Sequence, residues 1–273
     1  MHSKVLVKAM NEKSEYFLKE FLKPIRETDD NLSIRLSILF TLKQIAPEKF
    51  KELNLDQYLE SVISKIMVRV EKPISLLESI TSKIKQIVAK RASLYGLQPK
   101  LDYWYYTKLL GHKDRCKADH ELIKKIITNA KIEDVANSKD AVLFYIYVRT
   151  LSFCDLEEYG RFNKYIPILR KEAIKDADLY AYFLTHAILY DTNFGQKKAP
   201  KSSLKALKEL EDFCKNNLKF ERQYVDLMAE IIICCKLCKA DDFPFYAELV
   251  KNIMTTETFQ HYHENAVLAA ATF

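Results

Sequence analysis

The sequence predicts an all-α fold built from paired antiparallel helices. Four glycines and seven prolines in 273 residues are about a third of the usual share, which leaves too little turn chemistry for an all-β or a doubly wound α/β fold. Long stretches between them carry apolar residues at positions i, i+3, i+4 and i+7, the period of a helix packed on one face. With 48% hydrophobic residues, the chain can bury a large core.

The first third of the chain is divided by prolines at positions 24, 47, 73 and 99. Each interval fits one long helix or two short ones, and the polar runs 28–30 and 54–56 are typical of helix N-caps. This spacing of helix ends is typical of stacked helical hairpins, although no repeat of constant length is sustained. An α/α toroid and a helical-repeat-like bundle are the two arrangements that fit it.

The later part of the chain is more hydrophobic. Residues 101–110 include the only tryptophan and three tyrosines. Residues 141–153 are apolar on nearly every side, as expected of a helix surrounded by others. Residues 197–203 form an exposed loop, with Ser202 or Ser203 as the N-cap of the helix that follows.

We predict one all-α domain over residues 1–273, because no stretch is long enough to be a linker. Within this domain, residues 1–98 form an N-terminal helical subdomain. Residues 99–273 form the part that bears the candidate site.

Charge and cysteine content exclude several classes of protein. The 43 basic and 37 acidic side chains give a net charge of +6, and the basic residues are scattered among acidic ones, so nucleic acid is not an expected partner. No apolar run approaches the ~20 residues of a membrane span, so no membrane association is expected. Six cysteines, two of them adjacent, in a chain that does not need disulfides to fold indicate reduced thiols and a cytoplasmic location.

The chain also lacks the motifs of several common active sites. It contains no Gly-x-Ser-x-Gly elbow, no glycine-rich phosphate loop and no His-Glu-x-x-His. Four glycines are too few for a dinucleotide site, so no nucleotide cofactor is expected.

A histidine lies among tyrosines in one very apolar predicted helix. Asp178, Tyr182, His186 and Tyr190 are spaced four apart and therefore share one side of that helix, which ends before Gly195. Two interpretations fit. His186 is either a core histidine hydrogen-bonded to a neighbour, or a ligand or acid–base group that lines an internal cavity.

A second predicted helix, residues 221–239, carries Asp226 and Glu230 one turn apart among apolar side chains. Carboxylates in such surroundings are costly unless they are paired or coordinated. Cys234 and Cys238 continue the same stripe, but free cysteine is also a common core residue. Near the C-terminus, His263 lies on the packed side of a short final helix and is a further candidate.

Four short motifs occur in order along the last two-thirds of the chain. They are Gly111-His112; Thr185, His186, Tyr190, Phe194 and Gly195; Asp226, Leu227 and Glu230; and Tyr262-His263. Together they resemble an uncharacterised bacterial domain family that is often encoded near specialised-metabolite genes. The chain departs from that family at Asn193, where an acidic residue is usual, and at Glu264. The resemblance implies no established reaction, but it groups the candidate catalytic residues His186, Asp226, Glu230 and His263 into one site.

We therefore expect a His/carboxylate site in an aromatic-lined cavity between helices. His186, Glu230 and His263 would bind a divalent transition metal, and Asp226 would orient one of the histidines. The reaction is open between oxidation, hydrolysis and cyclisation.

Three aromatic residues would bind the substrate, a small organic molecule or a peptide. They are Tyr182, Tyr190 and Trp104. On this hypothesis the protein modifies specialised metabolites or peptides.

Two alternatives stay open. Without a metal, His186 and Asp226 or Glu230 would form an acid–base pair. In the second, the protein is a noncatalytic helical scaffold that binds a peptide or partner protein, and the polar groups are a structural network.

Overall fold

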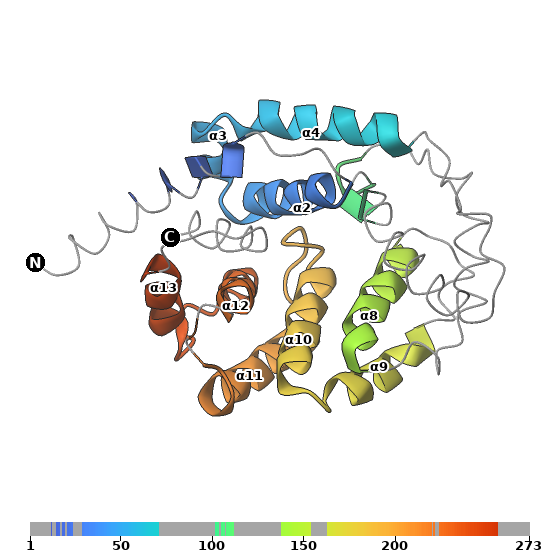
Figure 1. The fold of residues 1–273 in the computed structure, drawn as a ribbon, viewed down its shortest axis with the longest axis vertical. Coiled ribbons are helices and arrows are strands. Elements are labelled where there is room, and N and C mark those ends of the chain that lie inside the picture. The colour runs from blue at the N-terminus through green and yellow to red at the C-terminus, as the bar shows by residue number, and fades with distance from the viewer. Residues whose placement is uncertain are drawn as a thin grey trace, which may run out of the picture. The chain divides into compact units, whose positions relative to one another are not determined.

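The structure, a computed structural model, confirms the prediction of an all-α fold (Figure 1). It describes residues 12, 15–16, 18–19, 21–23, 29–70, 102–103, 105–106, 108–111, 138–153, 163–219, 221 and 224–255. Across these residues every regular element is a helix.

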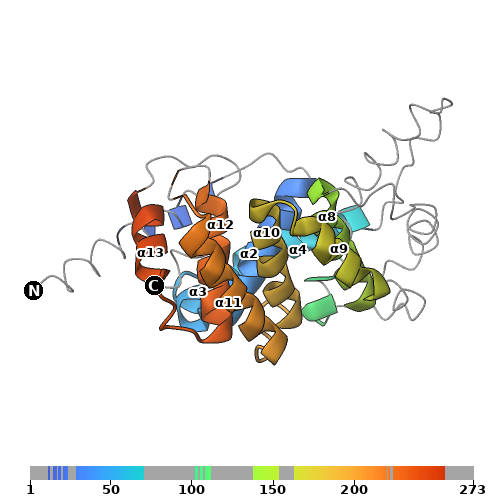
Figure 2. The ribbon, with the colours of Figure 1, turned by 90° about the horizontal axis from the view of Figure 1, so that it is seen from below.

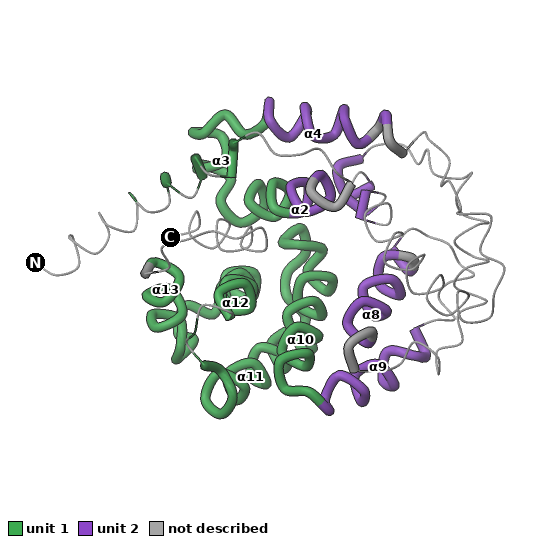
Figure 3. Tube along the Cα trace, in the orientation of Figure 1, with its two compact units in different colours: residues 1–26, 38–56, 176–273 green, residues 27–37, 57–175 purple. Residues whose placement is uncertain are grey.

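The chain divides into two compact units (Figure 3). Unit 1 contains residues 1–26, 38–56 and 176–273, and unit 2 contains residues 27–37 and 57–175. Helices α2 (Asp29–Ile45) and α4 (Leu55–Val70) pass from one unit to the other. The predicted boundary between residues 98 and 99 lies outside the described residues and stays a prediction.

Unit 2 is held together by partly buried polar contacts as well as by apolar side chains. Ser33 in α2 donates a hydrogen bond to Asp102 Oδ2 at 2.6 Å, and the hydroxyl of Tyr106 donates to Ser37 at 2.8 Å. The long helix α8 (Ser138–Phe153) packs against α9 (Ile166–Ala173). As the apolar sequence of residues 141–153 predicts, α8 is buried on most of its circumference.

Unit 1 is built mainly from four consecutive helices, which Figure 2 shows from a second direction. They are α10 (Ala177–Asp191), α11 (Lys201–Asn216), α12 (Val225–Cys238) and α13 (Tyr246–Thr255). The short helix α3 (Pro47–Glu52) and residues 38–45 of α2 belong to the same unit.

Side-chain contacts give the relative directions of the helices in unit 1. Asp191, at the end of α10, accepts a hydrogen bond from Ser202 at the start of α11 at 2.8 Å. Tyr180, near the start of α10, donates to Glu209 in the second half of α11, so these two neighbours in sequence are antiparallel. In contrast, Asp178 pairs with Tyr224 and Thr185 pairs with Glu230. Helices α10 and α12 are therefore parallel, and α11 packs against both of them.

Burial differs between the helices as their sequences predict. In α12, eleven of the fourteen residues are buried, because apolar residues cover nearly all of its surface. Helix α11 instead buries one face, which includes Leu207 and Leu210, and exposes its lysines. Its N-cap is Pro200 and not Ser202 or Ser203 as predicted. Ser202 and Ser203 lie in the first turn of the helix, and both hydroxyls donate to the Asp191 carboxylate, at 2.8 Å and 3.5 Å, which is a charged acceptor.

An unusual turn follows α10. Asn193, Phe194 and Gly195 all have positive φ values, of 48°, 53° and 104°. A Cβ atom at Gly195 would lie 3.0 Å from Gln44 Cβ and 3.1 Å from Leu237 Cδ2. Glycine is therefore needed there both for the backbone conformation and for the close approach of α2 and α12.

Among the residues that the structure describes, no helix is long and apolar enough to cross a membrane.

Candidate functional site

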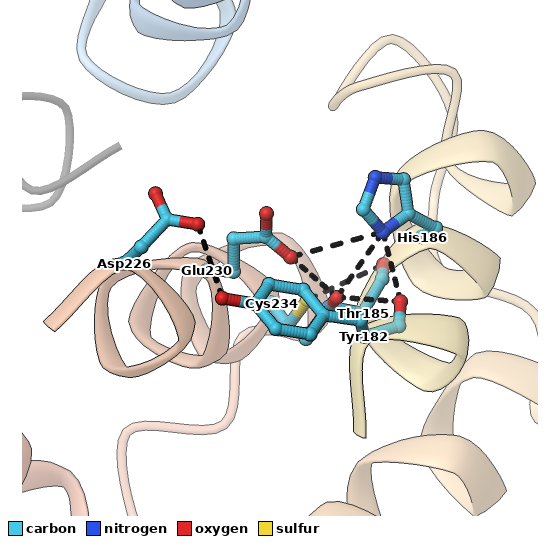
Figure 4. Close-up of polar contacts among 6 residues, drawn as sticks. All are labelled: Tyr182, Thr185, His186, Asp226, Glu230 and Cys234. Carbon is cyan, nitrogen blue, oxygen red and sulfur yellow. Dashed lines mark hydrogen bonds and ion pairs between the residues drawn. The ribbon is translucent and has the colours of Figure 1, made fainter. Parts of the chain in front are cut away.

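A cluster of polar side chains lies between the parallel helices α10 and α12 in unit 1 (Figure 4). Tyr182, Thr185 and His186 come from α10, and Asp226 and Glu230 come from α12. These positions meet because the parallel arrangement brings equivalent turns of the two helices side by side. The cluster sits in the most apolar part of the sequence, where each polar contact is costly to leave unmade.

The tautomer of His186 follows from its hydrogen bond. Its Nδ1 lies 2.8 Å from the carbonyl oxygen of Tyr182. Because a carbonyl oxygen only accepts hydrogen bonds, Nδ1 carries the hydrogen and Nε2 has the free lone pair. Burial lowers the pKa of His186 below its usual 6.5, so the neutral imidazole is the form at neutral pH.

Glu230 is buried and bonded to the same turn of α10. The hydroxyl of Thr185 donates to Glu230 Oε2 at 2.5 Å, and only 7% of the Glu230 side chain is exposed. Burial raises the pKa of Glu230 to about 7, and the hydrogen bond from Thr185 limits the rise. The carboxyl group therefore exchanges a proton near neutral pH.

Thr185 connects the two ionisable groups. Its Oγ1 lies 2.9 Å from the Tyr182 carbonyl oxygen, 2.5 Å from Glu230 Oε2 and 3.5 Å from His186 Nδ1. His186 Nδ1 and Glu230 Oε2 are themselves 3.8 Å apart, too far for a direct hydrogen bond. The hydroxyl has one hydrogen, and the short distance assigns it to Glu230, so Thr185 holds the carboxyl group beside the imidazole.

The sequence-based site did not include Thr185 as a functional residue. The available signal was its position next to His186 and three residues after Tyr182, which places all three on adjoining parts of one helical face. That signal is weak because threonine in an apolar helix commonly contacts the carbonyl of the preceding turn, and Thr185 Oγ1 likewise lies 2.9 Å from the Tyr182 carbonyl oxygen.

Asp226 contacts tyrosine and not histidine among the described residues. The hydroxyl of Tyr182 donates to Asp226 Oδ2 at 3.2 Å, while the carbonyl of the same Tyr182 holds His186. Asp226 therefore acts on the histidine through Tyr182 and through its charge, which favours the protonated imidazole. Burial and the nearby carboxylates raise the pKa of Tyr182 well above its usual 10, so the phenol stays protonated.

Tyr190 lies apart from this cluster. It is buried, and its ring meets that of Phe194 edge to face with centroids 5.4 Å apart. The other two predicted site residues, Trp104 and His263, lie outside the described residues. The structure thus brings together three of the four predicted catalytic residues, His186, Asp226 and Glu230.

The cysteines of α12 are part of the core. Cys234, Cys235 and Cys238 are free thiols, and the first two are buried. Cys234 Sγ donates to the carbonyl of Thr185 at 3.6 Å, and burial raises its pKa well above the usual 9. A neutral thiol of this kind packs as a small apolar side chain.

Of the three predicted metal ligands, the structure describes His186 and Glu230 but not His263. The His186 atom with a free lone pair is Nε2, whereas Glu230 faces Nδ1. In this arrangement a shared ion would require one of the two side chains to turn. Within the described part of the chain, no three His, Cys, Asp or Glu side chains are grouped so that they could hold a metal ion.

Comparison with known proteins supports the predicted link to an uncharacterised domain family. A family model described as a domain of unknown function (DUF6895) matches residues 169–261. That segment contains α10 to α13 and hence every described residue of the polar cluster. It begins after Gly111-His112 and ends before Tyr262-His263. No curated protein and no solved structure matches the chain.

Proposed function

We propose that the cluster between α10 and α12 is an acid–base site that acts on a small organic molecule or a peptide. His186 Nε2 accepts the proton, and the Glu230 carboxyl group is the second group that transfers one. The single observation that carries this proposal is the hydrogen bond from Nδ1 to the Tyr182 carbonyl. It fixes the imidazole in the tautomer whose Nε2 is basic.

The remaining contacts support the same role. Tyr182 holds the imidazole through its backbone, and Asp226 holds Tyr182 through its hydroxyl. Figure 4 shows Asp226, Glu230 and His186 on the same side of the helix pair, with Nε2 directed away from the hydrogen bonds of the cluster. A group that is oriented by its neighbours and has a free basic atom is arranged for chemistry as well as for packing.

The substrate class and setting follow the family resemblance and are part of the proposal. Specialised metabolites or peptides of a bacterial cell would be the compounds modified, with the protein in the cytoplasm. Free thiols at all four described cysteines support this location.

The test is a search for turnover with matched variants. Wild type, His186→Gln, Glu230→Gln and the exposed control Glu248→Gln are each incubated with a bacterial small-molecule extract and a peptide mixture. Mass spectrometry then follows compounds that are consumed or formed. We expect a compound that wild type and the control convert, and that both site variants convert about 100-fold more slowly while circular dichroism shows intact helices. Equal conversion by all four proteins would contradict the proposal.

A second candidate is a metal site, because metal-binding histidines characteristically donate their other ring nitrogen to a carbonyl or carboxylate, as His186 does. His186 Nε2, His263 and Glu230 would then hold a divalent transition metal. Elemental analysis of protein purified without chelator tests this. Near-stoichiometric metal in wild type that is lost in His186→Gln and His263→Gln supports it, and no metal after reconstitution contradicts it.

The noncatalytic scaffold is the remaining outcome of the turnover experiment. Compounds or peptides that bind without being converted, equally well in wild type and in both site variants, would indicate that the cluster is a structural network.

A further inference from the structure

The N-terminal half of α11 and the turn before it form a strongly basic surface. Five lysines occur between residues 196 and 208, and the same stretch contains no acidic residue. All five are exposed, and none forms an ion pair with a residue that the structure describes. We call this the lysine face, and its members are Lys197, Lys198, Lys201, Lys205 and Lys208.

The position of these lysines does not favour helix stability. The first turn of α11 contains no acidic residue, although the N-terminal end of a helix has a partial positive charge that favours acids and disfavours lysines. Acidic residues instead occur in the second half of α11, at Glu209, Glu211 and Asp212. Exposed charges that the helix dipole disfavours, and that form no ion pair with a described residue, point to a binding role.

One apolar side chain accompanies the charges. Leu204 is 49% exposed and lies along one edge of the row formed by Lys201, Lys205 and Lys208 on α11. These three lysines span about 10 Å along the helix, at 1.5 Å per residue. The lysine face therefore combines a row of positive charges with a single apolar contact point.

We propose that the lysine face binds an acidic segment of a partner protein, with carboxylates spaced along one face and an apolar residue that contacts Leu204. Charge complementarity carries this choice. Lysine provides compact point charges, and the face has no arginine for forked phosphate contacts and no aromatic residue for stacking on bases. In this fully described helix Leu204 is the one large exposed apolar side chain, which is too little for insertion into a lipid surface.

This inference is independent of the acid–base site, since its test uses binding alone. The probe is a short fluorescein-labelled peptide of glutamate, alanine and leucine, with a glutamine-for-glutamate peptide as its neutral counterpart. The test variant is Lys201→Glu/Lys205→Glu/Lys208→Glu. The control variant, Lys171→Glu/Lys215→Glu/Lys219→Glu, makes the same change in net charge at exposed lysines elsewhere.

We expect fluorescence anisotropy to show salt-dependent binding of the acidic peptide to wild type and to the control variant. The test variant should bind at least about tenfold more weakly, and Leu204→Ala should weaken binding a few-fold at every salt concentration. Circular dichroism checks that each variant is folded. Equal losses in both triple variants, or no binding by wild type, would overturn the proposal. Tighter lysine-face binding to anionic phospholipid vesicles or duplex DNA would also overturn it in favour of that partner.

Discussion

The middle and the C-terminal end of α10 are both buried, but their side chains make different kinds of contact. In the middle, Thr185 donates a hydrogen bond to Glu230, and His186 donates one to the Tyr182 carbonyl. At the end, Tyr190 packs on the ring of Phe194, and the following turn approaches neighbouring helices closely at Gly195. The sequence motif that resembles the uncharacterised family therefore has one polar part and one structural part.

The comparison shows that burial alone does not distinguish a functional residue from a core residue. Tyr190 and His186 lie on the same stripe of α10, but the Tyr190 ring meets that of Phe194, whereas His186 lies 3.8 Å from the Glu230 carboxyl group. Substitutions in the middle of α10 and at its C-terminal end should therefore have different effects on stability. Changes at the C-terminal end should alter the free energy of unfolding at every pH, while changes in the middle should alter its dependence on pH.

The largest expected effect is at the structural end. Replacing Phe194 with alanine removes a buried ring and should lower the free energy of unfolding by about 3–4 kcal/mol. Urea unfolding followed by circular dichroism measures this. The control Ile174→Ala, at a side chain that is 55% exposed, should stay within about 0.5 kcal/mol of wild type. Equal losses in the two variants would show that Phe194 is not part of the core.

Glu230→Gln tests the polar middle through pH. The pKa of Glu230 is about 7 in the folded protein against 4.5 as the ordinary value, so the folded state binds more protons than the unfolded state between those pH values. The wild-type free energy of unfolding should therefore fall as pH rises from about 4.5 to about 7, by about 3 kcal/mol from this residue.

Glutamine has no such titration, so the variant should lack this component and be the more stable protein above about pH 7. Unfolding curves at several pH values make the comparison, with Glu248→Gln as the exposed control. Parallel pH dependence of Glu230→Gln and wild type would remove Glu230 from the groups that titrate near neutrality.

A comparison of Gly195→Ala with Gly111→Ala separates the steric cost of a close approach from the cost of backbone strain. Gly111 also has a positive φ, of 80°, but among the described residues no other atom lies within 4 Å of a Cβ atom placed there. Gly111→Ala should therefore cost only the strain, about 1 kcal/mol, and Gly195→Ala about 2 kcal/mol or more. Thermal unfolding of both variants measures the difference. A cost at Gly195 no greater than at Gly111 would show that α2 and α12 can move away from the turn.

The smallest expected effect on stability is at Thr185. Thr185→Val removes the hydroxyl that bonds to Glu230 and should cost about 1 kcal/mol at neutral pH, while the pKa of Glu230 rises further. Thr185→Ser keeps the hydroxyl and should restore the pKa of wild type. Infrared absorption of the protonated carboxyl group, assigned with Glu230→Gln, follows the titration. An unchanged pKa in Thr185→Val would mean that the hydroxyl does not interact with the carboxylate.

Much of the local structure could be predicted because it depends on neighbouring residues. The apolar period predicted the helices, and the surrounding of α12 by apolar side chains was visible in its sequence. The cap of α11 was predicted wrongly, because the helix already begins at Lys201 and both serines lie in its first turn. Their hydroxyls donate to Asp191, an acidic residue that belongs to the preceding helix.

The sequence by itself determined that the chain is helical, that His186 and the pair Asp226 and Glu230 lie in apolar helices, and that these groups need partners. Which partners they have was decided only by the tertiary structure. Helices α10 and α12 are parallel with α11 packed against both, and this arrangement places Thr185 against Glu230 and Tyr182 against Asp226. The physical reason is that helical periodicity fixes which residues share a face, whereas the direction and register of a neighbouring helix depend on packing between segments distant in sequence.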